Sequence, residues 1–269
     1  MKKQFKVLSI IFTVIFISPL FLSWIPYNLV DGIFPASMKV NDFMHSLFES
    51  FRELSITLVS TVAFAMLISI LLGYLSVLSM GVGRFIATVM NMIESIPSIL
   101  IALFCYAPVS GALVSLKGNN STVLSLAVFV AAATATVLPE AVRSISIPLS
   151  DLYNRKYSVS FRSYGFTKNR ILSVLMKTDL LKDSIKRVLA GILLKTLVLD
   201  TSFGYVIQVG LGSTGTPQHT SPGALIAANR KAILFNSDIH PSYFWIPAIL
   251  LMSVSVACFL IIEQTKEEV

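Results

Sequence analysis

The chain has 269 residues, of which 55% are hydrophobic and only 13% are charged. Soluble domains carry about 25% charged residues, so this chain has roughly half the usual charge. So few polar residues cannot cover a globular core of this size, which excludes an ordinary soluble enzyme, a disordered protein and a disulfide-rich secreted module. The net charge of +7 does not indicate nucleic-acid binding, which needs a basic face on a soluble domain.

Apolar runs long enough to cross a membrane recur along the chain. A spanning helix needs about 20 mostly apolar residues, and its backbone must satisfy its own hydrogen bonds in lipid. The sequence therefore predicts an all-α integral membrane protein with six transmembrane helices, near Phe5–Leu29, Ile56–Ser79, Phe85–Tyr106, Val123–Val142, Val188–Ile207 and Phe244–Ile262. We expect residues 1–54 to form the first helix and an external loop, and residues 55–269 to form the five-helix core.

The distribution of Lys and Arg predicts the orientation, because these residues collect in cytoplasmic loops. With the N-terminus inside, about 14 basic residues lie on the cytoplasmic side and about 5 lie outside. Most of the inside residues fall between Arg143 and Arg187, which would form the main cytoplasmic loop. An even number of spans makes both termini cytoplasmic.

The middle of this inner segment, Tyr157–Asp183, has apolar residues at near-helical spacing with basic residues between them. Gly165 and Asn169 are expected to be breaks between short helices. Composition alone leaves two alternatives open. The segment either lies on anionic lipid headgroups or docks a cytoplasmic partner.

The outer segment, Gly210–Pro241, is rich in Gly, Pro, Ser and Thr. Its stretch Gly210–Gly215 matches G-x-G-x-x-G, but a dinucleotide loop should open a helix in a βαβ unit, and Pro217 follows here. We therefore expect an external turn, followed by a short interfacial helix over Ala224–Phe235. His45, His219 and His240 are too scattered to form a metal site.

The inner segment resembles the loop before the fifth span of the inner-membrane permease subunits of binding-protein-dependent ABC importers. That loop carries an E-A-A-x-x-x-G motif, preceded by Tyr and followed by a basic and hydrophobic run. Val159 stands at the usual Glu position, and Ser160 and Phe161 stand at the two Ala positions. The positions that match are Tyr157, Arg162, Gly165, Arg170 and Ile171.

Further matches lie in order within residues 50–265. Residues 95–98 resemble the Ser-Phe-Pro-Ser of the family's third span. Residues 200–203 followed by 210–212 resemble the acidic to Gly-Leu-Gly stretch that ends the fifth span, and residues 240–247 resemble the start of the last span. The chain is most similar to the dipeptide, oligopeptide and nickel permease branch, and within it to the second permease subunit.

The resemblance implies a bacterial inner-membrane subunit that forms half of a pathway for peptides or for a nickel or metal-chelate solute. It implies a second homologous permease, two cytoplasmic ATPases and an extracellular solute-binding lipoprotein as partners, besides membrane lipid. No G-x-x-x-x-G-K-[ST] stretch occurs, so ATP and Mg²⁺ would belong to the ATPases and this chain would be no enzyme and bind no cofactor or metal. The coupling helix would use Tyr157, Ser160, Phe161, Arg162, Tyr164, Gly165 and Arg170.

Charged residues within spans are costly and are functional candidates by default. Glu94, Lys195 and Asp200 are candidates to line the translocation pathway, with Pro97 bending the third span. The alternative is that Lys195 extends to the inner membrane surface and Asp200 satisfies backbone groups near the outer one. Lys195 and Asp200 are five residues apart, so they do not share one helix face. Glu140 and Arg143 are expected to form an ion pair at the inner membrane boundary.

Two other functions compete with the permease. A stand-alone secondary transporter usually shows inverted repeats and paired broken helices, and the sequence shows no such internal symmetry. A membrane-embedded enzyme would need clustered catalytic groups, and no histidine lies in any predicted span.

Overall fold

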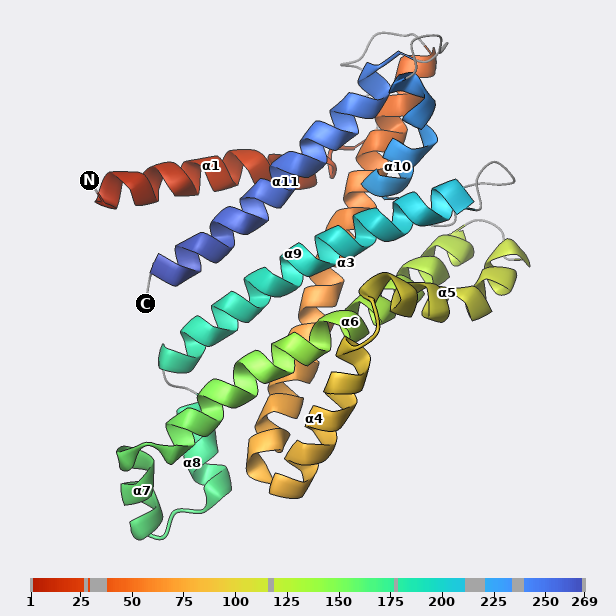
Figure 1. Cartoon of the computed structure of the whole chain (residues 1–269). Helices are drawn as coiled ribbons and strands as arrows, with labels where there is room; N and C mark the ends of the chain where they lie inside the picture. Colours follow the sequence, from red (N-terminus) through yellow and green to blue (C-terminus); the bar gives the residue numbers. More distant parts are fainter. Residues whose placement is uncertain are drawn as a thin grey trace.

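The computed structural model describes residues 2–26, 29, 38–115, 119–176, 179–210, 221–233 and 240–267. Within these ranges every regular element is a helix, which confirms the predicted all-α class. The elements, shown in Figure 1, are α1 (Lys2–Leu22), α3 (Met38–Leu78), α4 (Met80–Glu94), α5 (Ser98–Ser115), α6 (Asn119–Asn154), α7 (Lys156–Ser163), α8 (Lys168–Leu175), α9 (Asp179–Gly210), α10 (Pro222–Ala228), the 3₁₀ helix η1 (Arg230–Ile233) and α11 (Ser242–Glu267).

Four of the described helices contain stretches long and apolar enough to cross a membrane: Asp42–Leu78, Val123–Asn154, Ser184–Val209 and Ser242–Gln264. The pair α4 and α5 makes a fifth if it is counted as one broken span. The apolar stretch of α1, Leu8–Leu22, is shorter than the others. The described helices are those of a membrane protein, and the number of six spans stays a prediction.

Helix α3 corrects the expected external loop, because it begins at Met38 and not near Ile56. Four apolar residues recur along its first half at helical spacing and are buried: Phe43, Leu47, Phe51 and Leu54. Asp42 before the stripe, and Glu49 and other polar residues within it, lower the local hydropathy and hide the stripe. The packing of the stripe against α9 and α11 therefore makes the segment helical.

The long helices α3, α6 and α9 cross one another and enclose most of the core (Figure 1). One core cluster joins Ala65 of α3, Val137 of α6 and Ile192 of α9. At the opposite flank α11 packs on α1, and Gln264 donates to the hydroxyls of Ser9 and Thr13. The crossing at α3 fixes the positions of α6 and α9, which carry the candidate site.

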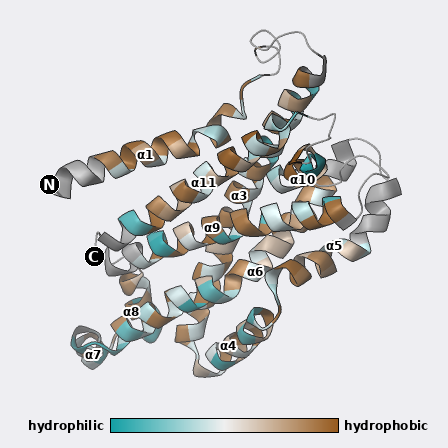
Figure 2. Cartoon of the chain, turned by 45° about the horizontal axis from the view of Figure 1, so that its top comes forward, coloured by the Kyte–Doolittle hydropathy of each residue, from teal (hydrophilic) through white to brown (hydrophobic). Residues whose placement is uncertain are grey.

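The inner segment forms a short helical hairpin of α7 and α8. It is shorter than the expected loop of 143–187, because α6 continues to Asn154 and α9 begins at Asp179. The hairpin turns at Gly165, as predicted. The predicted break at Asn169 is wrong, because this residue lies in the first turn of α8, where its backbone and side-chain oxygens accept hydrogen bonds from the hydroxyl of Tyr74. Hydrophilic residues gather around α7 and α8 (Figure 2).

The outer segment is described only from Ser221 to Ile233 and from His240 onward, so the expected turn at Gly210–Gly215 lies largely outside the described residues. The predicted short helix is present but begins earlier, at Pro222, and changes to η1 at Arg230. Ser221 caps α10 by accepting a hydrogen bond from the Ala224 N–H at 3.2 Å. The helix is buried against α9, and so it belongs to the helical bundle.

Candidate functional site

A row of charged side chains crosses three helices at the middle of the molecule. Glu140 and Arg143 are three residues apart on α6 and therefore occupy neighbouring positions on one face of that helix. The expected ion pair between them is replaced by two pairs to other helices. Arg143 lies 2.6 Å from Glu94 at the end of α4, and Glu140 pairs with Lys195 of α9.

One further polar residue contacts the row, and a small cavity lies beside it. The Arg143 guanidinium also donates to the Asn91 side-chain oxygen at 3.1 Å, so one turn of α4 presents both of its acceptors. A cavity of about 130 Å³ opens between α6 and α9 beside Glu140 and Lys195. Asn91 carries no charge, so the cost of charges within apolar runs does not identify it as a site residue.

All four charged side chains of the row are about half exposed: 49% for Glu94 and Arg143, and 56% and 52% for Glu140 and Lys195. A charge that faces hydrocarbon at the centre of a membrane helix costs about 2.5–3.5 kcal/mol on insertion scales. Exposed ion pairs on the flank of apolar helices are therefore favoured beside water or another protein. This face can line an aqueous path or a subunit contact.

The row ends at a break between two helices. Glu94 is the last residue of α4, and α5 begins at Ser98 with its axis turned by 88°. Pro97 lies immediately before α5, where its missing N–H costs no hydrogen bond. The predicted bend at Pro97 is present, and residues 95–97 are exposed.

The structure separates Asp200 from this row. Asp200 is 1% exposed, whereas the Lys195 side chain on the same helix is about half exposed, so the two residues occupy different faces of α9, as their spacing predicts. Of the four residues expected in the pathway, the structure brings Glu94 and Lys195 to one row and places Pro97 at its end. Asp200 packs inside the bundle.

The helical hairpin of α7 and α8 carries the residues that were expected to couple to a partner. Gly165 has φ = 82°, a backbone conformation that favours glycine and allows the sharp turn. Beside it, Tyr164 is 80% exposed and Phe161 is 41% exposed, with the Phe161 ring edge-on to Phe166. Ser160 is exposed as well, and the side chain of Tyr157 lies outside the described residues.

The two arginines of the hairpin have partners within the chain. Arg162 donates to the Tyr153 carbonyl at 2.6 Å, and its guanidinium lies 4.3 Å from the Tyr153 ring centroid. Arg170 lies over the Phe166 ring at 4.8 Å. These contacts hold the hairpin in shape, and Tyr153 is a residue that the motif comparison did not identify.

The hairpin is attached firmly to the end of α6. Ile171 and Leu172 of α8 are buried against Leu149 and Leu152 of α6. The buried Ser158 hydroxyl of α7 also donates to the Leu152 carbonyl at 2.8 Å. Because Arg143 and Leu152 lie on the same helix, about 14 Å of continuous α6 connects the charged row with the hairpin.

Within the described ranges no group of three His, Cys, Asp or Glu side chains is placed to hold a metal ion. Comparison with known proteins adds no identification, since no family model matches the chain. No curated protein matches it either.

Proposed function

We propose that the chain is a permease subunit of an ABC importer, which pairs with a second permease and is driven by cytoplasmic ATPases. The observation that carries the proposal is the arrangement of α6. This helix holds the charged row on its flank and the exposed hairpin on its end.

The hairpin has the shape that docking on a partner requires. It is a short, internally braced projection with Phe161 and Tyr164 exposed, and aromatic side chains of this kind anchor protein interfaces. A partner that moves the hairpin displaces α6 as a rigid body, because α8 is packed on that helix. The charged row then moves relative to its surroundings, as alternation between two packings requires.

The charged row fits the role of a pathway wall or of a contact with a second permease. In either position the exposed pairs lie beside water or protein, where their charge is not costly. The proposed cargo is a peptide or a nickel or metal-chelate solute, and an external binding lipoprotein would deliver it. These assignments rest on the family resemblance.

A second candidate is a stand-alone secondary transporter, favoured by one observation. Such transporters place their sites at discontinuous helices, and the 88° break between α4 and α5 puts Glu94 at a discontinuity. In that case an ion gradient would supply the energy.

Purification of the intact assembly from native membranes in mild detergent tests the proposal. We expect the full chain to elute with a second permease and with a protein that contains G-x-x-x-x-G-K-[ST] and hydrolyses ATP. The ATP-driven account is wrong if the chain elutes with no ATPase and, after reconstitution alone, takes up solute in response to an ion gradient.

A further inference from the structure

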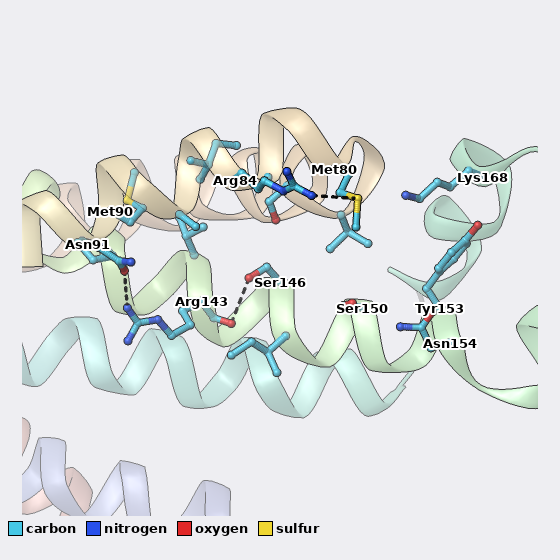
Figure 3. A pocket seen from close by; sticks show the side chains of 18 residues that line it. Met80, Arg84, Met90, Asn91, Arg143, Ser146, Ser150, Tyr153, Asn154 and Lys168 are labelled. Carbon is cyan, nitrogen blue, oxygen red and sulfur yellow. Dashed lines mark hydrogen bonds between the residues drawn. The ribbon is translucent and has the colours of Figure 1, made fainter.

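A cavity of about 630 Å³ lies between α4 and α6 and reaches α8 (Figure 3). One wall comes from α4, between Met80 and Asn91, and the other from α6, between Pro139 and Asn154. In Figure 3 the side chain of Lys168 extends from α8 toward the end of α4 that carries Met80 and Arg84. Ser76 and Val77 at the end of α3 also line it, so the cavity is bounded by four helices.

The lining of this cavity selects for negative charge. It includes Arg84, Arg143 and Lys168 and contains no Asp or Glu. Arg143 is already paired with Glu94. Within the described part of the chain, the Arg84 guanidinium lies 3.8 Å from the Met80 sulfur, and the Lys168 amine lies 5.2 Å from the centroid of the Tyr153 ring. Two cations from different helices are thus available to one anion.

Polar donors surround these two cations at the same end of the cavity. Ser150, Tyr153 and Asn154 come from the last turns of α6. They can donate further hydrogen bonds to the oxygens of a phosphate that the two cations hold. Basic and hydroxyl groups gathered in this way are the chemistry that binds phosphodiesters.

Away from the end that carries Arg84 and Lys168, part of the lining is apolar, and Asn91, Arg143 and Ser146 are the polar residues there. Ile86 and Met90 of α4 face Val142 of α6, and Met80 and Ile147 are exposed along its opening. A small hydrophilic anion leaves this wall uncovered, whereas an acyl chain fills it. The Arg84 end also follows directly on the end of α3 at Leu78, where its membrane-spanning stretch stops and headgroups are expected.

We propose that this cavity binds an anionic phospholipid, with the phosphodiester between Arg84 and Lys168 and an acyl chain along Ile86, Met90 and Val142. The lipid links the α4 wall to the hairpin through α8. This site does not depend on the proposed transport function, because it requires only a membrane that contains an anionic lipid.

Native mass spectrometry of the full chain in detergent, titrated with dioleoyl-phosphatidylglycerol, measures this binding. Dioleoyl-phosphatidylcholine serves as the uncharged comparison, and inorganic phosphate serves as a competitor. We expect phosphatidylglycerol to bind more tightly than phosphatidylcholine. Inorganic phosphate should not displace the bound phosphatidylglycerol. The double variant R84Q/K168Q should bind phosphatidylglycerol about 30-fold more weakly, since each near-membrane basic residue contributes roughly fivefold.

The matched control is R155Q/K156Q, which removes the same charge from exposed residues at the same end of the molecule but outside the cavity. This control and the charge-conserving exchange R84K/K168R should keep the wild-type affinity, which separates site loss from misfolding. Equal binding of the two lipids, or equal weakening by the control, overturns the proposal. Displacement by inorganic phosphate means that the cavity is a free-anion site and the lipid assignment is wrong.

Discussion

The Arg143 guanidinium lies 2.6 Å from the Glu94 carboxylate and joins the middle of α6 to the end of α4. Each side chain is 49% exposed. The pair is therefore placed to respond to whatever occupies that face, and it contributes little to the stability of the chain by itself. Removal of this pair should consequently change the stability of the chain little and reduce transport strongly.

The stability of the isolated chain should barely change in Glu94→Gln or Arg143→Gln. An exposed ion pair contributes about 0.2–1 kcal/mol because solvent screens it. A double-mutant cycle on thermal unfolding in detergent should return a coupling energy in this range. A loss of several kcal/mol in either single variant would contradict the half-exposed geometry.

Transport by the intact assembly should be much more sensitive to the same variants. Each one leaves an unpaired charge on the proposed pathway, and we expect uptake to fall at least about tenfold, which is a barrier change of about 1.4 kcal/mol. The exchanged pair Glu94→Arg with Arg143→Glu should recover part of the uptake. Wild-type uptake in both single variants would remove the row from the pathway.

The turn of the hairpin should depend on the backbone of Gly165 alone. A Cβ at this position would meet no atom within 4 Å, so the cost of a substitution comes only from φ = 82°. We expect Gly165→Leu to destabilise the turn by about 1–2 kcal/mol and Gly165→Asn by less, since Asn tolerates this conformation. Hydrogen exchange over residues 156–175 measures the effect, and equal protection in both variants would argue against a strained turn.

The contact between α9 and α10 should tolerate no side chain at Gly204. A Cβ there would collide with the Ser221 hydroxyl, which caps α10. We expect Gly204→Ala to cost about 1–3 kcal/mol through overpacking. Gly191→Ala on the same helix is the control: its Cβ meets nothing within 4 Å, and the change should stabilise α9 by about 0.5–1 kcal/mol. Thermal unfolding of the two variants should shift in opposite directions.

Attachment of the hairpin to α6 should fail when its buried apolar contact is removed. Leu172 is fully buried beside Leu149, and Leu172→Ala should cost about 2–5 kcal/mol. Val174→Ala on the same helix is 54% exposed and should have little effect. Faster hydrogen exchange confined to α7 and α8 in the Leu172 variant is the expected result, and no difference between the two variants would show that α8 is held by other contacts.

The sequence predicts most of the helices, and the failures have definite physical causes. The apolar runs of α3, α6, α9 and α11 are long enough to dominate composition, so these helices are located correctly. The first half of α3 was missed because Asp42, Glu49, Arg52 and Glu53 lower its hydropathy, and only packing reveals the common face of Phe43 and Leu47. Asn169 is a weak helix former in isolation, but its contact with Tyr74 fixes it in α8.

The candidate site was predicted in part. The cost of charges in apolar runs singled out Glu94 and Lys195, and the structure places both in the row. Sequence distance then favoured pairing Glu140 with Arg143, whereas the helix crossing brings each of them closer to a partner on another helix. Asp200 could not be separated from Lys195 in advance, because burial depends on which face of α9 meets its neighbours.

Site-specific photocrosslinking from position 164 tests most directly whether the hairpin is driven by an ATPase. The photoreactive residue p-benzoyl-phenylalanine replaces Tyr164 in cells, with Ile233, which is also exposed, as the control position outside the hairpin. We predict an adduct at position 164, absent at position 233, with a protein that carries G-x-x-x-x-G-K-[ST]. Adducts from position 164 only with lipid or with an extracellular protein, while the chain is present at its normal level in the membrane, would contradict it.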